Sequence, residues 1–374
     1  MATYKEQNKL NVPHLRFPEF QGEWEKCKLG DIAEFSTARV SSVKLDCKNY
    51  VSTENMLQDF QGVVEAKSVP NETNVISFTC GDILISNIRP YLKKVWKATF
   101  DGGCSSDVFV LQATDTVAKD YLHYAVANDK FINYVMSGAK GVKMPRGDKN
   151  QMRTYQLSLP SIQEQYKIAK LLTLLDERIA TQSKLIEKLE SLIKGLAHHC
   201  IRDFTNDCEY IRLGDISKIT TGKLDANAQV ENGQYPFFTC AERPFNIDSY
   251  AFDTEALLIS GNGANLGYIN YYKGKFNAYQ RTYVLDHFSV NIQYVKWALK
   301  VLLPQRIALE KSSSNTPYIV LSTLANLKIP IPNNSKQNHI ANLMMSFEKK
   351  LSNQLALSDL YNKQKQYMLR QMFI

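Results

Sequence analysis

The residues of this chain that could do chemistry on a ligand are mostly lysines and arginines, and in the first half they gather in two clusters. One cluster lies between Arg89 and Lys97, and the other lies in a glycine-bearing stretch between Lys140 and Arg153. Cationic side chains on such loops suit contact with phosphate groups and can reach into a groove. A solvated basic face is the simpler interpretation, and it stays open at this point. The cations predicted to contact phosphate are Arg89, Lys93, Lys94, Lys140, Lys143, Arg146 and Lys149.

The second half offers isolated cations among tyrosines, together with one glycine-rich loop. Residues Ser260–Gly267 follow an apolar strand and resemble a dinucleotide-binding turn. That fingerprint needs the turn to open a helix, whereas we expect a Tyr-rich strand after Gly267. A loop that lets the backbone approach a ligand is the favoured interpretation, and Asn or Arg side chains near it could read adenine or guanine edges. The ligand contacts predicted in this half are Lys223, Arg243, Asn262, Arg281, Lys311 and Asn315.

Motifs of enzymes are not found in the sequence. There is no Gly-x-x-x-x-Gly-Lys-Ser/Thr loop for a nucleotide, no Asn/Asp-Pro-Pro-Tyr/Phe motif and no convincing set of nuclease carboxylates. His198 and His199 are adjacent, so on a helix they point to different faces and make a poor metal site. We therefore predict no catalytic residue, no metal site and no cofactor bound by this chain itself.

Composition and charge set broad limits on the class of protein. The chain has 374 residues, enough for two domains with connecting elements, and 44% of them are hydrophobic. Its net charge of +8 argues only weakly for a nucleic-acid partner. There is no apolar run of about 18 residues, so no membrane span is predicted. The seven cysteines include no Cys-x-x-Cys pair, which favours reduced thiols and a cytoplasmic location.

A long amphipathic helix is expected between Pro160 and Arg202. Ser161 can cap it, and Glu164 completes a capping box three residues later. Apolar residues then recur at alternating steps of four and three, the heptad pattern of a coiled coil. A helix of roughly 33 residues is about 50 Å long, and its seam needs a partner. The seam residues are Leu172, Leu175, Ile179, Gln182, Ile186, Leu189 and Ile193.

The partner is a second copy of the same pattern, later in the chain. Gln182 returns as Gln354, and these two polar seam positions are expected to fix the register of the helices. Asn334 and Gln337 are expected to cap the second helix, and its seam weakens beyond Leu357. The seam residues of this helix are Met344, Phe347, Leu351 and Gln354.

Each long helix follows a globular unit, and the two units share a pattern. Leu29–Ile32 and Leu213–Ile216 open them with the same four residues, and both close on a short apolar strand that ends in proline. Alternating apolar segments predict β-rich domains, with short amphipathic helices at Tyr121–Asn128 and Tyr294–Lys300. The second unit starts where the first helix ends and finishes where the second begins. The two helices are therefore expected to pack antiparallel.

The duplicated order of domain and helix resembles the specificity subunit of type I restriction–modification systems. The resemblance covers essentially the full chain. It is carried by the two Leu-Gly-Asp-Ile openers, by Gly81–Ser86, and by Leu159–Gln165 followed by Ile168-Ala169. The second lead-in departs from the usual pattern, because residues 333–337 lack the Glu-Gln pair.

This resemblance implies a mixed α/β (α+β) fold with a pseudo-two-fold internal repeat. Two similar target-recognition domains would be separated by two long antiparallel coiled-coil helices. The expected boundaries are residues 1–159 for an N-terminal arm plus the first domain, 160–202 for the first spacer helix, 203–333 for the second domain and 334–374 for the second spacer helix.

The resemblance also implies a non-catalytic function in DNA recognition. Each domain would read one half of a bipartite double-stranded DNA target, and the helices would set the spacer. Two methyltransferase subunits would dock on the chain and methylate adenine, and motor-nuclease subunits would carry out restriction. S-adenosylmethionine, ATP and Mg²⁺ would belong to those partners. The alternatives are a coiled-coil scaffold that joins two protein- or glycan-binding modules and, third, a stand-alone enzyme.

Overall fold

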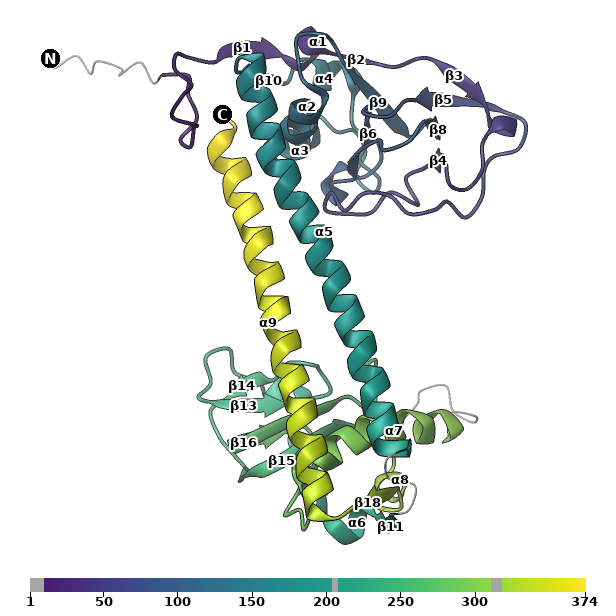
Figure 1. The fold of residues 1–374 in the computed structure, drawn as a ribbon, viewed down its shortest axis with the longest axis vertical. Coiled ribbons are helices and arrows are strands. Elements are labelled where there is room, and N and C mark those ends of the chain that lie inside the picture. The colour runs from purple at the N-terminus through teal and green to yellow at the C-terminus, as the bar shows by residue number, and fades with distance from the viewer. Residues whose placement is uncertain (1–9, 204–207, 311–317) are drawn as a thin grey trace, which may run out of the picture. The chain divides into compact units, whose positions relative to one another are not determined.

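The computed structural model describes residues 10–203, 208–310 and 318–374, which divide into two compact units (Figure 1). Unit 1 comprises the residues through Gln182 together with Leu357–Ile374, and unit 2 comprises Ser183–Ala356. Two long helices, α5 (Ile162–His198) and α9 (Asn334–Met372), contribute one segment to each unit. None of the described helices is long and apolar enough to cross a membrane.

Unit 1 contains one strand pair and two four-stranded sheets. Strand β1 (Glu25–Lys28) pairs antiparallel with β10 (Gln156–Leu159), which brings the start and the end of the domain together. The first sheet has the order β2 (Ala33–Phe35), β9 (Val108–Ala113), β6 (Ile83–Ser86) and β7 (Val95–Lys97). The second sheet has the order β3 (Arg39–Ser41), β5 (Asn74–Phe78), β8 (Gly102–Cys104) and β4 (Tyr50–Val51).

Helices cover the first sheet and form the main core of unit 1. The sheet residues Ile83 and Leu111 are buried in one cluster with Tyr121 and Leu122. This cluster also includes Leu172 of α5, so the long helix is part of the domain core. The helices of the domain are α1 (Leu29–Ile32), α2 (Lys119–Val126), α3 (Asp129–Ser137) and α4 (Lys149–Arg153), with 3-10 turns η1 (Ser42–Lys44) and η2 (Pro90–Leu92).

Unit 2 repeats the strand pair and builds one larger sheet. Strand β11 (Glu209–Arg212) pairs antiparallel with β18 (Lys328–Ile331). The six-stranded sheet has the order β12 (Lys218–Thr221), β17 (Thr282–Asp286), β15 (Phe252–Ser260), β16 (Ile269–Ala278), β13 (Tyr235–Phe238) and β14 (Phe245–Ile247). The helices are α6 (Leu213–Ile216), α7 (Ile292–Glu310) and α8 (Leu321–Ala325), with the π-helical segment η3 (His199–Asp203) and the 3-10 turn η4 (Ala226–Ala228).

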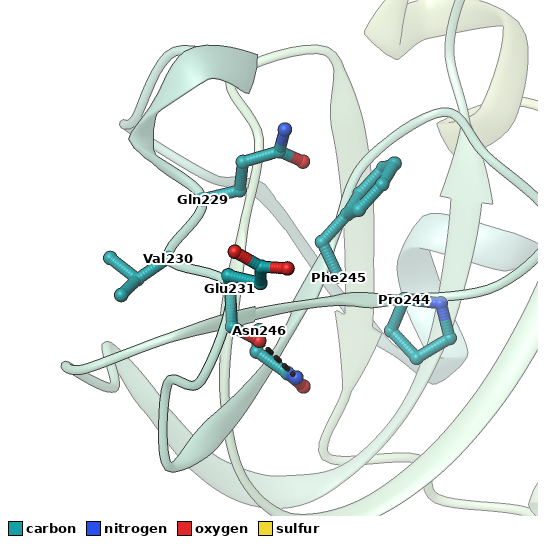
Figure 2. A pocket seen from close by; sticks show the side chains of 6 residues that line it. All are labelled: Gln229, Val230, Glu231, Pro244, Phe245 and Asn246. Atoms are coloured by element: carbon teal, nitrogen blue, oxygen red, sulfur yellow. Dashed lines mark hydrogen bonds between the residues drawn. The ribbon is translucent and has the colours of Figure 1, made fainter.

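A hollow of about 520 Å³ lies at the β14 edge of this sheet. Figure 2 shows the exposed ring of Phe245 on one side of it and the loop that carries Gln229 and Val230 on the other. Asn246 donates a hydrogen bond to the backbone carbonyl of Glu231 at 3.3 Å, which ties the edge strand to that loop.

The internal repeat predicted from the sequence is confirmed by matched strand pairs and matched hydrogen bonds. The Leu29 N–H donates to the Tyr155 carbonyl at 2.8 Å in unit 1, and the Leu213 N–H donates to the Leu327 carbonyl at 2.9 Å in unit 2. The two units differ in their sheets and in the helices that follow β9 and β17. The helix predicted at Tyr294–Lys300 is confirmed, but its predicted length was too short, because α7 is 19 residues long and runs through Pro304.

Two buried glutamines join the start of each long helix to its domain in the same way. Gln165 donates to the Pro160 carbonyl at 2.9 Å and accepts the Ala118 N–H at 2.8 Å, just before α2. Gln337 donates to the Pro332 carbonyl at 2.8 Å and accepts the Asn291 N–H at 3.0 Å, just before α7. Both side chains are almost fully buried. Each amide therefore satisfies one backbone acceptor and one backbone donor at the same junction.

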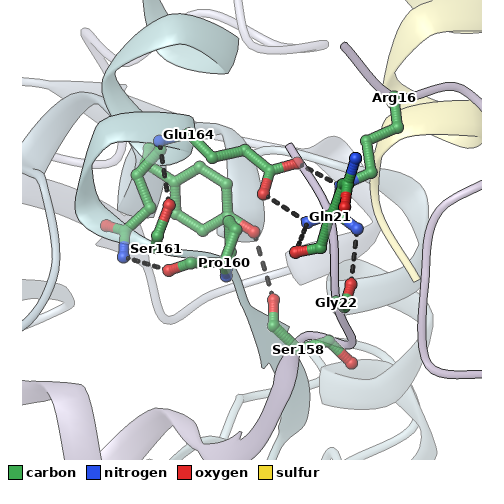
Figure 3. A network of polar contacts seen from close by, with 9 residues as sticks. Arg16, Gln21, Gly22, Ser158, Pro160, Ser161 and Glu164 are labelled. Atoms are coloured by element: carbon green, nitrogen blue, oxygen red, sulfur yellow. Dashed lines mark hydrogen bonds and ion pairs between the residues drawn. The ribbon is translucent and has the colours of Figure 1, made fainter. Parts of the chain in front are cut away.

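The N-terminal caps of the long helices differ from the predicted ones. Ser161 Oγ accepts the Glu164 N–H at 3.4 Å, but the Glu164 carboxylate does not return to Ser161. It receives Nε and Nη2 of Arg16, each at 2.8 Å, and Figure 3 shows this ion pair beside the arm residues Gln21 and Gly22. The capping box was therefore half wrong. A buried carboxylate prefers a bidentate cation to a single amide donor.

The cap predicted at Asn334 was also wrong. The side chain of Asn333 accepts the Lys336 N–H at 2.9 Å, so Asn333 caps α9. The shift that maps Gln182 onto Gln354 also maps Ser161 onto Asn333. The register of the repeat was therefore a better guide to the cap than the preferred residue type alone.

Within each unit the segments of α5 and α9 pack side by side. In unit 1 Asp176 of α5 pairs with Lys365 of α9 at 2.6 Å. Two residues further along α5, Arg178 donates to the hydroxyl of Tyr361, which lies four residues before Lys365 on α9, at 2.8 Å. The residue numbers run in opposite directions, so the segments are antiparallel. The predicted seam residues Leu172, Leu175, Gln182, Ile186, Leu189, Ile193 and Met344 are buried, and Ile179, Phe347, Leu351 and Gln354 are half-buried.

Candidate nucleic-acid interface

In unit 1 three segments meet where β6 ends and β9 begins. The Asn87 N–H donates to the Asp107 carbonyl at 2.8 Å, and the Gly147 N–H donates to the Asn87 carbonyl at 3.0 Å. The Arg89 N–H donates to the Pro145 carbonyl at 2.8 Å. We call the surface formed by residues 87–89, 107 and 140–147 the strand-end surface of unit 1. These bonds bring Arg89 of the first basic cluster next to the segment 140–147 of the second, at one edge of the sheet.

The segment 140–146 is a small hairpin that projects from this surface. The backbones of Lys140 and Arg146 exchange two hydrogen bonds, at 3.0 and 2.9 Å. Gly141 has φ of +97°, a conformation that glycine adopts without the strain of a side chain. Val142 is 100% exposed and Lys143 is exposed beside it. The glycine that suggested a loop in the sequence therefore forms the turn that carries the cations outward.

Four of the predicted cations lie together on this surface. Arg89, Lys140, Lys143 and Arg146 are exposed. Arg146 donates to Asp107 Oδ1 at 3.1 Å, and Lys140 lies 3.7 Å from a carboxylate oxygen of Asp148 while 85% of its side chain stays exposed. An exposed cation with one weak acidic neighbour keeps most of its capacity to meet a phosphate.

The other three predicted cations of unit 1 serve its fold. Lys93 pairs with Asp129 at 2.8 Å. Lys94 donates to the Thr53 carbonyl at 2.6 Å, and its burial lowers the pKa of its ammonium. Lys149 lies 4.7 Å from the centroid of the Phe109 ring, and burial lowers its pKa as well. The structure therefore separates these three lysines from the exposed set, although they adjoin it in sequence.

Unit 2 has an equivalent surface at the end of β15. The Gly261 N–H donates to the Arg281 carbonyl at 2.8 Å, and the Ile319 N–H donates to the Gly261 carbonyl at 2.9 Å. Asn262 forms a bridge with Tyr318. We call the surface formed by residues 223–224, 260–263, 279–281 and 318 the strand-end surface of unit 2. The bond from Gly261 to Arg281 is equivalent to the bond from Asn87 to Asp107 in unit 1. The bond from Ile319 to Gly261 is equivalent to the bond from Gly147 to Asn87.

The predicted contacts of unit 2 converge here in part. Lys223 and Arg281 are exposed, and the Gln280 N–H donates to the Leu224 carbonyl at 2.9 Å, which brings their segments together. Arg243 is exposed on the loop that leads to β14. Lys311 and Asn315 lie outside the described residues.

The exposed ring of Tyr318 on this surface was not predicted. A signal for it was present in the sequence, because the shift that maps Gln182 onto Gln354 also maps Arg146 onto Tyr318. The repeat could therefore have identified it as the counterpart of a predicted contact.

The remaining candidate features do not suit a phosphate or a metal. The hollow beside β14 is lined by Glu231 and by no cation. The loop Ser260–Gly267 closes with the Gly267 N–H on the Ser260 carbonyl at 2.8 Å and leads into strand β16, as expected, so it opens no helix for a dinucleotide. All seven cysteines are free thiols, and no group of three His, Cys, Asp or Glu side chains could hold a metal among the described residues.

Comparison with a family of known proteins agrees with the repeat. The family described as the type I restriction modification DNA specificity domain matches twice, over residues 21–191 and 205–357. The specificity subunit of the type I restriction enzyme EcoDI from Escherichia coli is 43% identical over 135 residues, which span 36% of this chain and 30% of that protein. The specificity subunit of the MjaVIII enzyme from Methanocaldococcus jannaschii is 22% identical over 93% of this chain and 91% of its own.

Solved structures share the fold over nearly the whole chain. The S subunit of a type I restriction–modification system from M. genitalium has a TM-score of 0.66 at 17% identity, over 97% of this chain and 99% of that one. A chain from a structure on complex assembly and conformational transition of the type I system has a TM-score of 0.57 at 19% identity, over 92% of this chain and 96% of that one. With two matching domains that together cover most of its length, the chain belongs to the type I restriction–modification DNA specificity family.

Proposed function

We propose that this chain is the DNA-specificity subunit of a type I restriction–modification complex and recognises a bipartite target with one half-site per domain. The observation that carries the proposal is the pair of matched strand-end surfaces, one in each of two domains of the specificity family. Both surfaces project exposed cations from a rigid sheet edge. Such groups on a fixed scaffold suit phosphate anchoring next to base contacts.

The long helices would set the spacer between the half-sites. Helix α5 has 37 residues, and at about 1.5 Å per residue it is about 55 Å long. Its buried seam and its cross-links to α9 support a stiff element. A rigid element between two recognition domains would fix the number of base pairs that separate their targets.

Catalysis would belong to partner subunits of the complex. Two methyltransferase subunits with S-adenosylmethionine would methylate an adenine in each half-site. Restriction subunits with ATP and Mg²⁺ would act on unmethylated DNA. The present chain would direct both activities in the cytoplasm without supplying a catalytic group.

Salt-dependent affinity for duplex DNA tests the DNA-binding part of the proposal. We expect the chain with its methyltransferase partners to bind a labelled duplex, because exposed lysines and arginines displace counterions from phosphates. With about six phosphate contacts, affinity should fall about 1,000-fold between about 50 and 200 mM salt. Affinity that is absent, or that does not change with salt, would favour the scaffold of two non-DNA binding modules.

An exchange of the second domain tests the bipartite part. Residues 205–330 would be replaced by those of a relative with a different methylated motif, and adenine methylation would be mapped across the host genome. One half of the motif should change and the other should stay. The half that stays is assigned to unit 1. A change in both halves, or in neither, contradicts one half-site per domain.

A further inference from the structure

Among the exposed cations of the strand-end surface of unit 1, Arg146 is held by hydrogen bonds at both its backbone and its side chain. Its N–H and carbonyl bond to Lys140 on one side, at 2.9 and 3.0 Å. On the other side it forms a bridge with Ile88. Its neighbours Pro145 and Gly147 bond to Arg89 and Asn87. Backbone contacts on both sides of Arg146 therefore fix the position of its Cα atom, independently of its side chain.

The guanidinium of Arg146 is oriented by an acid on a different segment. Its Nη1 donates to Asp107 Oδ1 at 3.1 Å, and the carbonyl of Asp107 accepts the Asn87 N–H at 2.8 Å. One of the five N–H donors of the guanidinium is used in this bond, and 53% of the side chain stays exposed. This bond therefore orients the planar guanidinium toward Asp107 and leaves other N–H donors for a ligand.

This arrangement differs from that of the lysines on the same hairpin. Lys143 stands at the exposed tip between Val142 and Met144. A lysine ammonium is a point charge on a flexible stem, so it suits a phosphate whose position varies. A fixed arginine fork matches the two acceptors O6 and N7 that guanine presents in the major groove. The two kinds of cation on one hairpin are therefore suited to different parts of a duplex.

The internal repeat shows that the Arg146–Asp107 pair is not required by the fold. Unit 2 keeps the backbone bonds of the frame, with Gly261 bonded to Arg281 at 2.8 Å and to Ile319 at 2.9 Å. At the positions of Asp107 and Arg146, however, it carries Arg281 and Tyr318. A frame that stays constant while its exposed side chains differ is what two domains need in order to read different half-sites.

We propose that Arg146, oriented by Asp107, reads a guanine in the half-site that unit 1 recognises. This inference rests on the proposed function, and it adds the base and the reading residue. Asp107 is a positioning residue, since it acts on the DNA through the guanidinium. The predicted half-site of unit 1 must therefore contain at least one G·C pair.

The test compares Arg146→Lys with Lys143→Ala in the chain assembled with its methyltransferase partners. Arg146→Lys keeps the charge and the backbone bonds, so affinity for a non-specific duplex should change by less than about two-fold. Discrimination at one G·C position of the unit 1 half-site should fall about 10- to 100-fold, because the bidentate contact is lost. The half-site of unit 2 should stay unchanged. Asp107→Ala should reduce discrimination at the same position.

Lys143→Ala provides the matched control. It should leave the methylated motif unchanged and lower the slope of log affinity against log salt by about 0.9, the value for one phosphate contact. A unit 1 half-site without a G·C pair, or an unchanged motif in Arg146→Lys, would overturn the role of Arg146 while the proposed function stands. Loss of salt-dependent duplex binding by the unmodified complex would instead overturn the proposed function.

Discussion

At the scale of single residues, the environment of each ionisable group decides what it can do. His123 on α2 has a buried Nδ1 without a hydrogen-bond partner among the described residues. Burial is the largest cause that lowers the pKa of His123, and the positive charges of Lys365 and Lys97 lower it further. Asp176 and Asp120 oppose this effect, and the resulting pKa is about 4. The folded protein therefore keeps this imidazole neutral well below the pH at which an unfolded chain would protonate it.

We expect this histidine to make stability depend on pH. The unfolded chain binds a proton near pH 6.5 and the folded chain near pH 4, so the free energy of unfolding should fall as the pH decreases between these values. By about pH 5.5 the loss should be about 1 kcal/mol. Urea unfolding at pH 7.5 and 5.5 measures it. His123→Gln, which does not titrate, should lose this component of the pH dependence, and an identical dependence in the variant would contradict the assignment.

The sequence predicted the roles of individual site residues only in part. Glycine at 141 and the nearby lysines and arginine identified the hairpin, because turn chemistry and charge are local properties. The roles of Lys94 and Lys149 could not be read from charge, since a carbonyl 41 residues away and two distant aromatic rings decide them. The contact of Arg146 with Asp107 spans 39 residues and depends on how β6 and β9 pair.

At the scale of elements, one carboxylate on each long helix holds a helix of the adjoining domain. Asp176 of α5 accepts the hydroxyl of Tyr124 at 2.8 Å. Glu348, its equivalent on α9 in the internal repeat, accepts Lys296 at 2.6 Å and Lys300 at 2.8 Å. Burial raises the pKa of Glu348, but the two lysines outweigh this effect and hold the pKa below its usual value. The carboxylate is therefore charged at neutral pH and compensates Lys296, whose side chain is 9% exposed.

Glu348→Gln should destabilise unit 2, because it leaves the ammonium of Lys296 buried without an anion. We expect a loss of about 3 kcal/mol, the lower end for breaking a buried ion pair, since 31% of the Glu348 side chain is exposed. Lys300→Met is the matched control, and it should cost about 1 kcal/mol or less because Lys300 is more exposed. Chemical unfolding followed by circular dichroism compares the two. Equal losses would argue against a special role for Lys296.

The elements themselves were largely predictable, and the reason is periodicity. The heptad spacing from Leu172 to Ile193 placed one helix, and its copy in the second half of the chain placed the other. The ends of the helices were less predictable. A competing partner such as Arg16, 148 residues from Glu164, can take over a capping side chain without leaving a local signal. Likewise α7 continues through Pro304, although proline usually ends a helix.

At the scale of the whole molecule, we predict that the two long helices set the length of the spacer between the half-sites. Insertion of one heptad into both α5 and α9 preserves the seam, and should lengthen the spacer of the methylated motif while leaving both half-sites unchanged. Genome-wide mapping of adenine methylation measures the spacer. An insertion in α5 alone is the control, because it puts the two seams out of register and should impair assembly. An unchanged spacer in the double insertion would contradict this prediction.

The buried glutamines at the two junctions have a mechanical consequence. A domain that pivoted on its helix would have to break both hydrogen bonds of Gln165, or both of Gln337, and would leave backbone groups unsatisfied in a dry environment. Each such group costs about 1–3 kcal/mol. The junctions between each domain and the helix that follows it are therefore rigid and do not act as hinges. A force on either domain is transmitted directly to the start of the long helix that follows it.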